Sequence, residues 1–202
     1  MKIVHIETLI HKGGFANSPE WQKIREQALC AVKAVDWPPG SGTFSIYPES
    51  GKKTGQGNGV KPIKNAAIAH LIKEGWLSEH PWPVGERIRP GNMDAAYIST
   101  TGLIAFEWET GNISSSHRSM NKMALGLLKG VTIAGLLVVP SRKLYPFLTD
   151  RIGNYDELEP YLPLWKATPC DKGILEIIVI EHDAESSSVP RIPKGTDGRA
   201  SV

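Results

Sequence analysis

Hydrophobic positions recur at helical spacing in two segments of the first half of the chain. Residues 19–35 place apolar side chains on one helix face, and residues 63–76 repeat that pattern, with Gly75 as the expected stop. Residues 36–62 lie between them and contain so many glycines and prolines that only a short strand over 43–47 is expected. We interpret residues 36–62 as a functional loop, because the flanking apolar segments are too short to form separate domains.

The second half of the chain alternates between strand and helix patterns. The predicted strands cover residues 95–99, 103–109, 133–139 and 173–181, and the predicted helices or helical turns cover residues 118–128 and 143–151. A strand, a helix and a second strand in this order favour a crossover between parallel strands. The pattern therefore predicts an α/β fold with a central mixed β-sheet flanked by helices, in a single domain over residues 1–202 whose loop-like tail covers 184–202.

Composition narrows the class of protein only slightly. Apolar residues make up 41% and charged residues 22% of the 202 residues, as in ordinary globular proteins. The net charge of +2 is too small to indicate a nucleic-acid binder by itself. Cys30 and Cys170 lie far apart without metal-ligand spacing, and neither a signal peptide nor an apolar run of membrane-spanning length is apparent. We expect a cytoplasmic protein.

Three acidic residues form the sharpest chemical pattern. Asp94 precedes Glu107 and Glu109, and the period of two along a strand places both glutamates on one face, with Trp108 directed into the core. Neighbouring carboxylates repel each other unless a cation lies between them. Carboxylate oxygens suit Mg²⁺, which assists phosphodiester hydrolysis. A solvated strand end carrying unrelated acids is the alternative, since such spacings also arise by chance.

The residues after Glu109 form a polar run that opens the predicted helix. Residues 110–118, TGNISSSHR, combine short hydrogen-bonding side chains with an arginine. A helix N-terminus offers backbone N–H groups to phosphate, and Asn and Arg side chains read adenine and guanine edges in the major groove. The alternative is that this run only caps the helix.

Several ordered blocks resemble the BamHI-type type II restriction endonucleases, within the PD-(D/E)xK nuclease class. The blocks are NGVKPIK at 58–64, SEHP at 78–81, GNMDA at 91–95, FEWETGNISSSHRSMNKMALGLLKG at 106–130, YPFLTDRIGNYDELEPYLPLW at 145–165 and VPRIPKGTDGR at 189–199. They cover most of the chain. The resemblance implies a restriction-endonuclease-like fold and sequence-specific cleavage of double-stranded DNA.

The resemblance also implies roles for individual acids. Asp94 and Glu107 match the metal-binding carboxylates, and Glu79 in the short SEHP block matches a further acid that contributes to the metal site. Glu109 stands where most PD-(D/E)xK nucleases have lysine. A carboxylate there can orient or deprotonate the attacking water and complete a two-ion arrangement. We expect Mg²⁺ to support turnover and Ca²⁺ to bind without it.

The DNA-binding residues implied by the resemblance lie in three blocks and one loop. Major-groove contacts are assigned to Asn112, Ser114, Arg118, Asp150 and Arg151, and a minor-groove contact to Asp197. The position of Lys61 and Lys64 beside the second predicted helix suits phosphate contacts, and of the two Lys64 matches the family's lysine. Outside the resemblance, Asp150 reads as a helix cap, the Asp197 segment as a turn, and the lysines as solvated side chains. The family implies the palindrome GGATCC, cut after the first G to leave 5′-phosphate GATC overhangs. A palindrome requires a symmetric homodimer, for which helices 63–74 and 118–128 both offer apolar faces.

Two alternatives stay open. One is a DNA-binding protein on the same fold that has lost cleavage, although the complete set of Asp94, Glu107 and Glu109 argues against it. The other is a repair nuclease that selects DNA structure, although the retained base-reading side chains argue against that.

Overall fold

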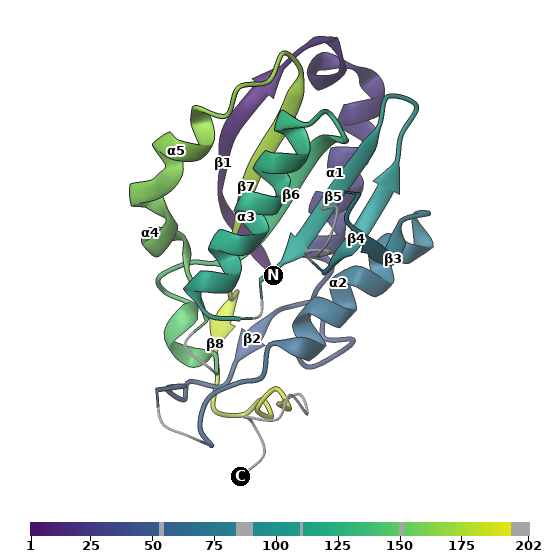
Figure 1. The fold of residues 1–202 in the computed structure, drawn as a ribbon. Helices are drawn as coiled ribbons and strands as arrows, with labels where there is room; N and C mark the ends of the chain where they lie inside the picture. Colours follow the sequence, from purple (N-terminus) through teal and green to yellow (C-terminus); the bar gives the residue numbers. More distant parts are fainter. Residues whose placement is uncertain (53–54, 84–90, 110, 150–151, 195–202) are drawn as a thin grey trace.

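The core of the structure is a six-stranded mixed sheet. A computed structural model describes residues 1–52, 55–83, 91–109, 111–149 and 152–194. The strands are β1 (Lys2–Lys12), β3 (Leu77–Pro81), β4 (Asn92–Ile98), β5 (Leu103–Trp108), β6 (Thr132–Pro140) and β7 (Gly173–Glu181). Their order is β1-β7-β6-β5-β4-β3, with β5, β6 and β7 parallel and the outer pairs antiparallel. The predicted mixed sheet is therefore confirmed (Figure 1).

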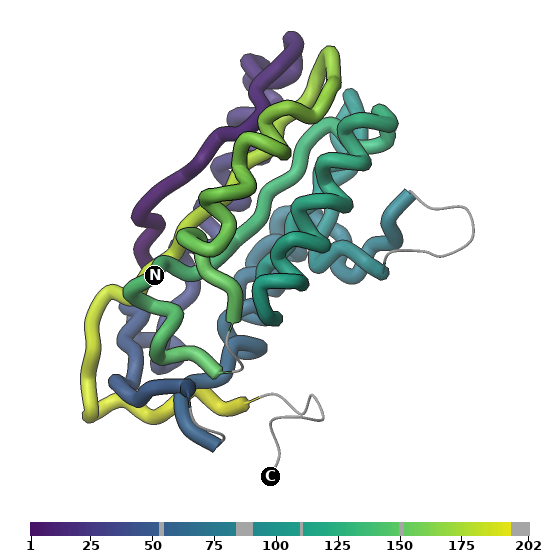
Figure 2. The backbone as a smooth tube through the Cα atoms, turned by 60° about the vertical axis from the view of Figure 1, so that its left-hand side comes forward, coloured from purple at the N-terminus to yellow at the C-terminus, as the bar shows by residue number. Residues whose placement is uncertain are grey.

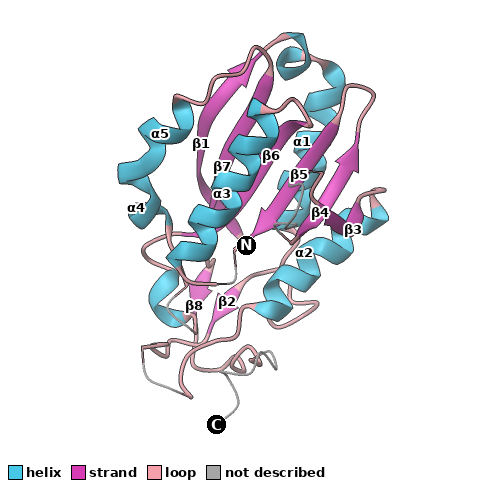
Figure 3. Ribbon diagram, in the orientation of Figure 1, coloured by secondary structure: helices cyan, strands magenta, loops and turns pink. Residues whose placement is uncertain are grey.

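Helices cover both faces of this sheet. The α1 helix (Pro19–Lys33) and α2 (Lys61–Lys73) contribute to one hydrophobic cluster, together with Ile104 and Phe106 of β5. The α3 helix (Ile113–Leu128), α4 (Tyr155–Leu158) and α5 (Leu162–Lys166) contribute to the other, together with Ala105. The alternation of Ile104, Ala105 and Phe106 between the two clusters follows from the period of two along a strand. Figure 3 shows the resulting order of helix, sheet and helix layers.

Local capping explains where the main helices begin. Ser18 caps α1, its hydroxyl oxygen accepting from the Trp21 backbone N–H at 3.1 Å, and α1 matches the helix predicted from residue 19. The start that was predicted for the helix over 118–128 is wrong. The α3 helix begins at Ile113, because the side-chain oxygen of Asn112 accepts from the backbone N–H groups of Ser114 and Ser115 at 3.1 and 3.4 Å.

Several other predicted boundaries also shift. The glycine-rich loop ends sooner than predicted, because α2 begins at Lys61. Pro62 occupies the first turn of α2, where a backbone N–H has no partner within the helix, so the missing N–H of proline costs no hydrogen bond. The strand predicted over 43–47 is only β2 (Ser45–Ile46), which pairs with β8 (Ala184–Glu185) in what was predicted to be a plain tail. Of the helix or turn predicted over 143–151, the described residues 143–149 contain a short 3-10 helix (Tyr145–Phe147).

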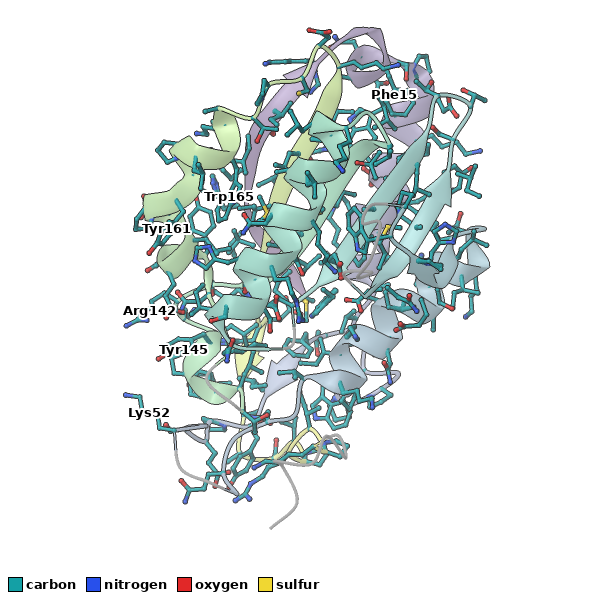
Figure 4. All side chains as sticks on the ribbon, in the orientation of Figure 1. Phe15, Lys52, Arg142, Tyr145, Tyr161 and Trp165 are labelled. Atoms are coloured by element: carbon teal, nitrogen blue, oxygen red, sulfur yellow. The ribbon has the colours of Figure 1, made fainter. Side chains whose placement is uncertain are left out.

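The elements that were not predicted include β1, β3, α4 and α5. The last two form a short helical layer beside α3, where Trp165 donates from Nε1 to Asn121 Oδ1 at 3.0 Å and the rings of Tyr161 and Trp165 lie against His117 (Figure 4). Among the described residues, none of the helices has the length and apolar character needed to cross a membrane.

Candidate active site

Two neighbouring strands bring the predicted acids together. Asp94 lies on β4 and Glu107 on β5, each one residue beyond the paired residues Ala95 and Phe106. Glu109 follows the end of β5. All three acids line one cavity of about 320 Å³ that also reaches the first turns of α3. Trp108 is buried in the cluster on the α1 side, as predicted.

Backbone N–H groups orient two of the carboxylates. Asp94 Oδ2 accepts from the Trp108 N–H at 2.8 Å, which ties β4 to the end of β5. Glu109 Oε1 accepts from the Gly111 N–H at 2.6 Å, so the loop before α3 holds this side chain. The loop also keeps Gly111 close to its neighbours, since an added Cβ would lie 2.6 Å from Ser115 Oγ. The site is therefore built by local chain geometry as well as by the sheet.

Two lysines form ion pairs with Asp94 and Glu107. Lys64 Nζ of α2 lies 2.8 Å from Asp94 Oδ1, and Lys122 Nζ of α3 lies 2.7 Å from Glu107 Oε1. Lys122 and Glu107 are only 8% and 6% exposed. Trp82 adds an Nε1 donor 3.3 Å from the same Glu107 oxygen, and its ring lies 5.3 Å below the Lys122 ammonium. Each side of the sheet thus supplies one lysine to the cavity.

Burial and charge shift the pKa values of this cluster. Burial raises the pKa of Glu107, and Lys122 only partly offsets it. Burial alone would lower the pKa of Lys64, but Asp94, Glu79 and Glu107 outweigh that effect and raise it. The charges of these five groups therefore act on one another.

Sequence reasoning did not identify Lys122. Arg118 and Lys122 both line the cavity, and their spacing of one helical turn was the available signal. Lysine on a helix is usually solvated, so the buried position of Lys122 depends on how α3 packs across β6 and β7. The structure adds Lys122 to the site.

Glu79 lies at the margin of the site. It is exposed on β3 and adopts a positive φ of 49°, a backbone conformation that few residues other than glycine adopt. The residues lining the cavity do not include it. Its charge nevertheless acts on Lys64, so the structure places Glu79 within electrostatic reach of the acids.

The predicted DNA contacts lie in several places. Asn112 and Ser114 are exposed at the start of α3, and the exposed Arg118 also lines the cavity. Within the run for which helix capping was the alternative, Asn112 caps α3. Lys61 is exposed in the first turn of α2, one turn before Lys64. Asp150, Arg151 and Asp197 lie outside the described residues.

The carboxylates of the cavity are suitable ligands for a divalent cation. Three carboxylates line one cavity, and oxygen ligands of this kind suit Mg²⁺. Within the described residues, no three acidic, histidine or cysteine side chains already converge on a common metal position. Two lysine ammonium groups instead stand in for cations beside Asp94 and Glu107.

Comparison with a solved structure identifies the fold class. The fold is similar to that of the restriction endonuclease BglII in complex with a DNA 16-mer, with a TM-score of 0.58 and 11% identity, over 95% of this chain and 88% of that one. The structure therefore has the α/β fold of the restriction endonucleases.

Sequence comparison identifies the family. The family model for restriction endonuclease BamHI matches residues 1–199. The chain is 47% identical over 200 residues to the type II restriction enzyme OkrAI of Oceanobacter kriegii, covering 99% of both chains. It is 38% identical over 187 residues to the type II restriction enzyme BamHI of Bacillus amyloliquefaciens, covering 87% of this chain and 84% of that one. The chain belongs to the BamHI family of restriction endonucleases, which are site-specific deoxyribonucleases.

Proposed function

We propose that this protein is a Mg²⁺-dependent endonuclease that cuts double-stranded DNA at GGATCC after the first G, leaving 5′-phosphate GATC overhangs. The observation that carries the proposal is the cavity in which Asp94, Glu107 and Glu109 meet the start of α3. Family membership and the names of the two relatives support it. The same support favours a role in a cytoplasmic, bacterial-type restriction system.

Asp94 and Glu107 are the residues proposed to hold the metal, with Glu79 contributing from β3. When bound, Mg²⁺ polarises the scissile phosphate and lowers the pKa of a coordinated water. Glu109, held by the Gly111 N–H, orients the attacking water and accepts its proton. Lys64 and Lys122 pair with Asp94 and Glu107, the acids that would hold the metal, and with a metal bound there both ammonium groups would be available to phosphate oxygens.

Base recognition is assigned to the start of α3 and two further segments. Arg118 and Arg151 can each donate two hydrogen bonds to guanine, and Asp150 can accept from cytosine. Asn112 and Ser114 lie at the start of α3, and Arg118, one helical turn after Ser114, lines the cavity. Asp197 is assigned to the minor groove. Lys61 and Lys64 are assigned to phosphates. Reading a palindrome with one such set per half-site requires a symmetric homodimer.

The test is digestion of a fully sequenced plasmid with purified protein in Mg²⁺, followed by sequencing of the fragment ends. We expect discrete fragments with ends at G/GATCC. Discrete cutting elsewhere would retain the catalytic assignment and refute the base-reading assignment. Tight binding to a GGATCC duplex in Ca²⁺ without cutting in Mg²⁺ would refute the catalytic assignment. A Lys143→Met variant is a suitable control, because Lys143 forms an exposed ion pair with Glu181 away from the cavity.

A further inference from the structure

Three segments that are distant in sequence meet at one end of the sheet. They are the described residues of 47–59 within the glycine-rich loop, the segment 145–149 that follows β6, and the segment 190–194 that follows β8. Figure 2 shows these stretches, in blue, green and yellow, gathered at the end of the molecule where the chain ends. We call this junction the three-segment clasp.

Asn58 is the centre of the clasp and is completely buried. Its side-chain amide donates to Tyr47 O at 2.9 Å and to Phe147 O at 3.0 Å. Its side-chain oxygen accepts from the Ile192 N–H at 3.2 Å. One side chain therefore joins all three segments, and both amide hydrogens and the oxygen are used.

The backbone of Asn58 adds two further bonds to the middle segment. Its N–H donates to Phe147 O at 2.8 Å, and its carbonyl accepts from the Thr149 N–H at 2.9 Å. The result is a short parallel bridge between Asn58 and Leu148. Residues 147–149 are thereby held on both sides of Leu148 by one residue of the loop.

Two glycines show how closely the segments approach each other. A Cβ added at Gly51 would lie 1.8 Å from Leu148 O, and one added at Gly59 would lie 2.0 Å from Pro193 O. Both contacts are to backbone atoms, which a side-chain rotation cannot relieve. Gly59 also donates from its N–H to Ile192 O at 2.8 Å. Glycine is therefore required at these positions by space.

The clasp connects the proposed reading segments to the cavity. Thr149 directly precedes Asp150 and Arg151, and Lys194 precedes the stretch that contains Asp197. On the other side, α2 begins at Lys61, three residues after Asn58, and its Lys64 is bonded to Asp94. A displacement of the clasp would therefore move Thr149 and Lys194, the last described residues before the proposed readers, relative to Lys64 and Asp94.

We propose that Asn58 is a positioning residue for specificity: it holds the two segments that lead to the proposed base readers in fixed register with α2 and the catalytic cavity. This inference rests on the proposed function. It assigns to the glycine-rich loop the task of making cleavage depend on correct base contacts. Loss of Asn58 should relax discrimination more than it reduces the maximal rate.

The experiment compares kcat/KM on a GGATCC duplex with kcat/KM on duplexes carrying one changed base pair. Asn58→Asp keeps the shape and the acceptor for Ile192 but replaces both amide donors with a carboxylate oxygen that repels Tyr47 O and Phe147 O. Because one base pair is worth roughly 1–3 kcal/mol of discrimination, we expect the ratio to fall about tenfold or more. An unchanged ratio in a folded variant would overturn the inference.

Two further variants keep this result interpretable. Arg25→Met removes the ion-pair partner of the buried Glu176, whose carboxylate lies 2.8 Å from Arg25 Nε. This pair lies outside the clasp, so the substitution should destabilise the protein without changing the ratio. An equal fall of the ratio in Arg25→Met would show that lost stability causes the fall, and it would overturn the inference.

Arg191→Met breaks the outer contact of the clasp with Glu49, at 2.6 Å. It should lower the ratio to a smaller degree even if Asn58→Asp does not fold. An unchanged ratio in that case would also count against the inference. Failure of the proposed function itself would be distinguishable, because the unaltered protein would then produce no fragments with ends at G/GATCC.

Discussion

Replacement of Lys122 by methionine tests the electrostatic structure of the cavity. The substitution keeps the length and apolar stem of the side chain but removes the ammonium group 2.7 Å from Glu107 Oε1. Breaking a buried ion pair by removing one partner costs about 3–5 kcal/mol. Trp82 still donates to Glu107, so we expect a loss near the lower limit, about 3 kcal/mol of unfolding free energy.

Urea denaturation of the metal-free protein measures this loss. With a slope of about 2 kcal/mol per molar urea, the midpoint should fall by about 1.5 M. The Lys143→Met control should lose at most about 1 kcal/mol, because the side chain of Lys143 is 62% exposed in its pair with Glu181. We expect Ca²⁺ to bind the carboxylates of the folded state, and it should therefore reduce the loss in Lys122→Met.

A double-mutant cycle identifies the cause of the loss. Adding Glu107→Gln to Lys122→Met removes the unpaired charge, so the double variant should be within about 1 kcal/mol of the unaltered protein. The reasoning is refuted if Lys122→Met loses no more than Lys143→Met. It is also refuted if the two losses at Lys122 and Glu107 simply add.

Three further outcomes can be checked. Glu109→Gln should reduce cleavage in Mg²⁺ by about 100-fold or more while leaving binding to GGATCC in Ca²⁺ intact, as measured by gel shift; retained cleavage would show that Glu109 does not act on the water. Arg118→Lys should lose roughly 1–3 kcal/mol of discrimination at one G·C pair in competition binding, and a uniform loss over all sequences would instead indicate a phosphate contact. Burial lowers the pKa of His182, so the unfolded chain binds more protons below about pH 6.5 and stability should fall with decreasing pH, by at most about 1.4 kcal/mol per pH unit for this group. In His182→Asn that part of the pH dependence should disappear from urea titrations, and an unchanged profile would assign it to other groups.

The central part of the site could be predicted because it depends on local periodicity. The strand period of two places Glu107 and Glu109 on the cavity side and Trp108 in the core, and these placements hold in the structure. The strongly apolar β6 and β7 strands, buried along both faces, were equally clear. These features need only a few neighbouring residues to specify them.

The elements that were missed depend on tertiary contacts. The edge strand β1 pairs with β7 through two register shifts, between Ile3 and His5 and between Thr8 and Ile10, which interrupt its alternation. The short α4 and α5 helices contribute few apolar residues each and are stabilised against α3 through Leu158, Leu162 and Trp165. Neither signal is visible in a local window of sequence.

The glycine-rich loop shows a different limit. Its density of glycine and proline predicts the absence of regular structure, which is largely correct, but composition does not show why glycine is needed. Gly51 and Gly59 are required by approaching backbone of segments about 100 and 130 residues away in sequence, as the contacts with Leu148 and Pro193 show. Only the folded structure supplies those partners.

Asn112 shows how capping and base reading restrict each other. Its side-chain oxygen is occupied by the backbone N–H groups of Ser114 and Ser115, so the capped side chain offers a base its amide donors. A contact that used both its oxygen and its nitrogen would first have to release the cap, at about 1 kcal/mol. The start of α3 is close to Glu109, whose carboxylate is fixed by the Gly111 N–H in the same loop. Release of the Asn112 cap would therefore change the position of Glu109, the residue proposed to orient the attacking water.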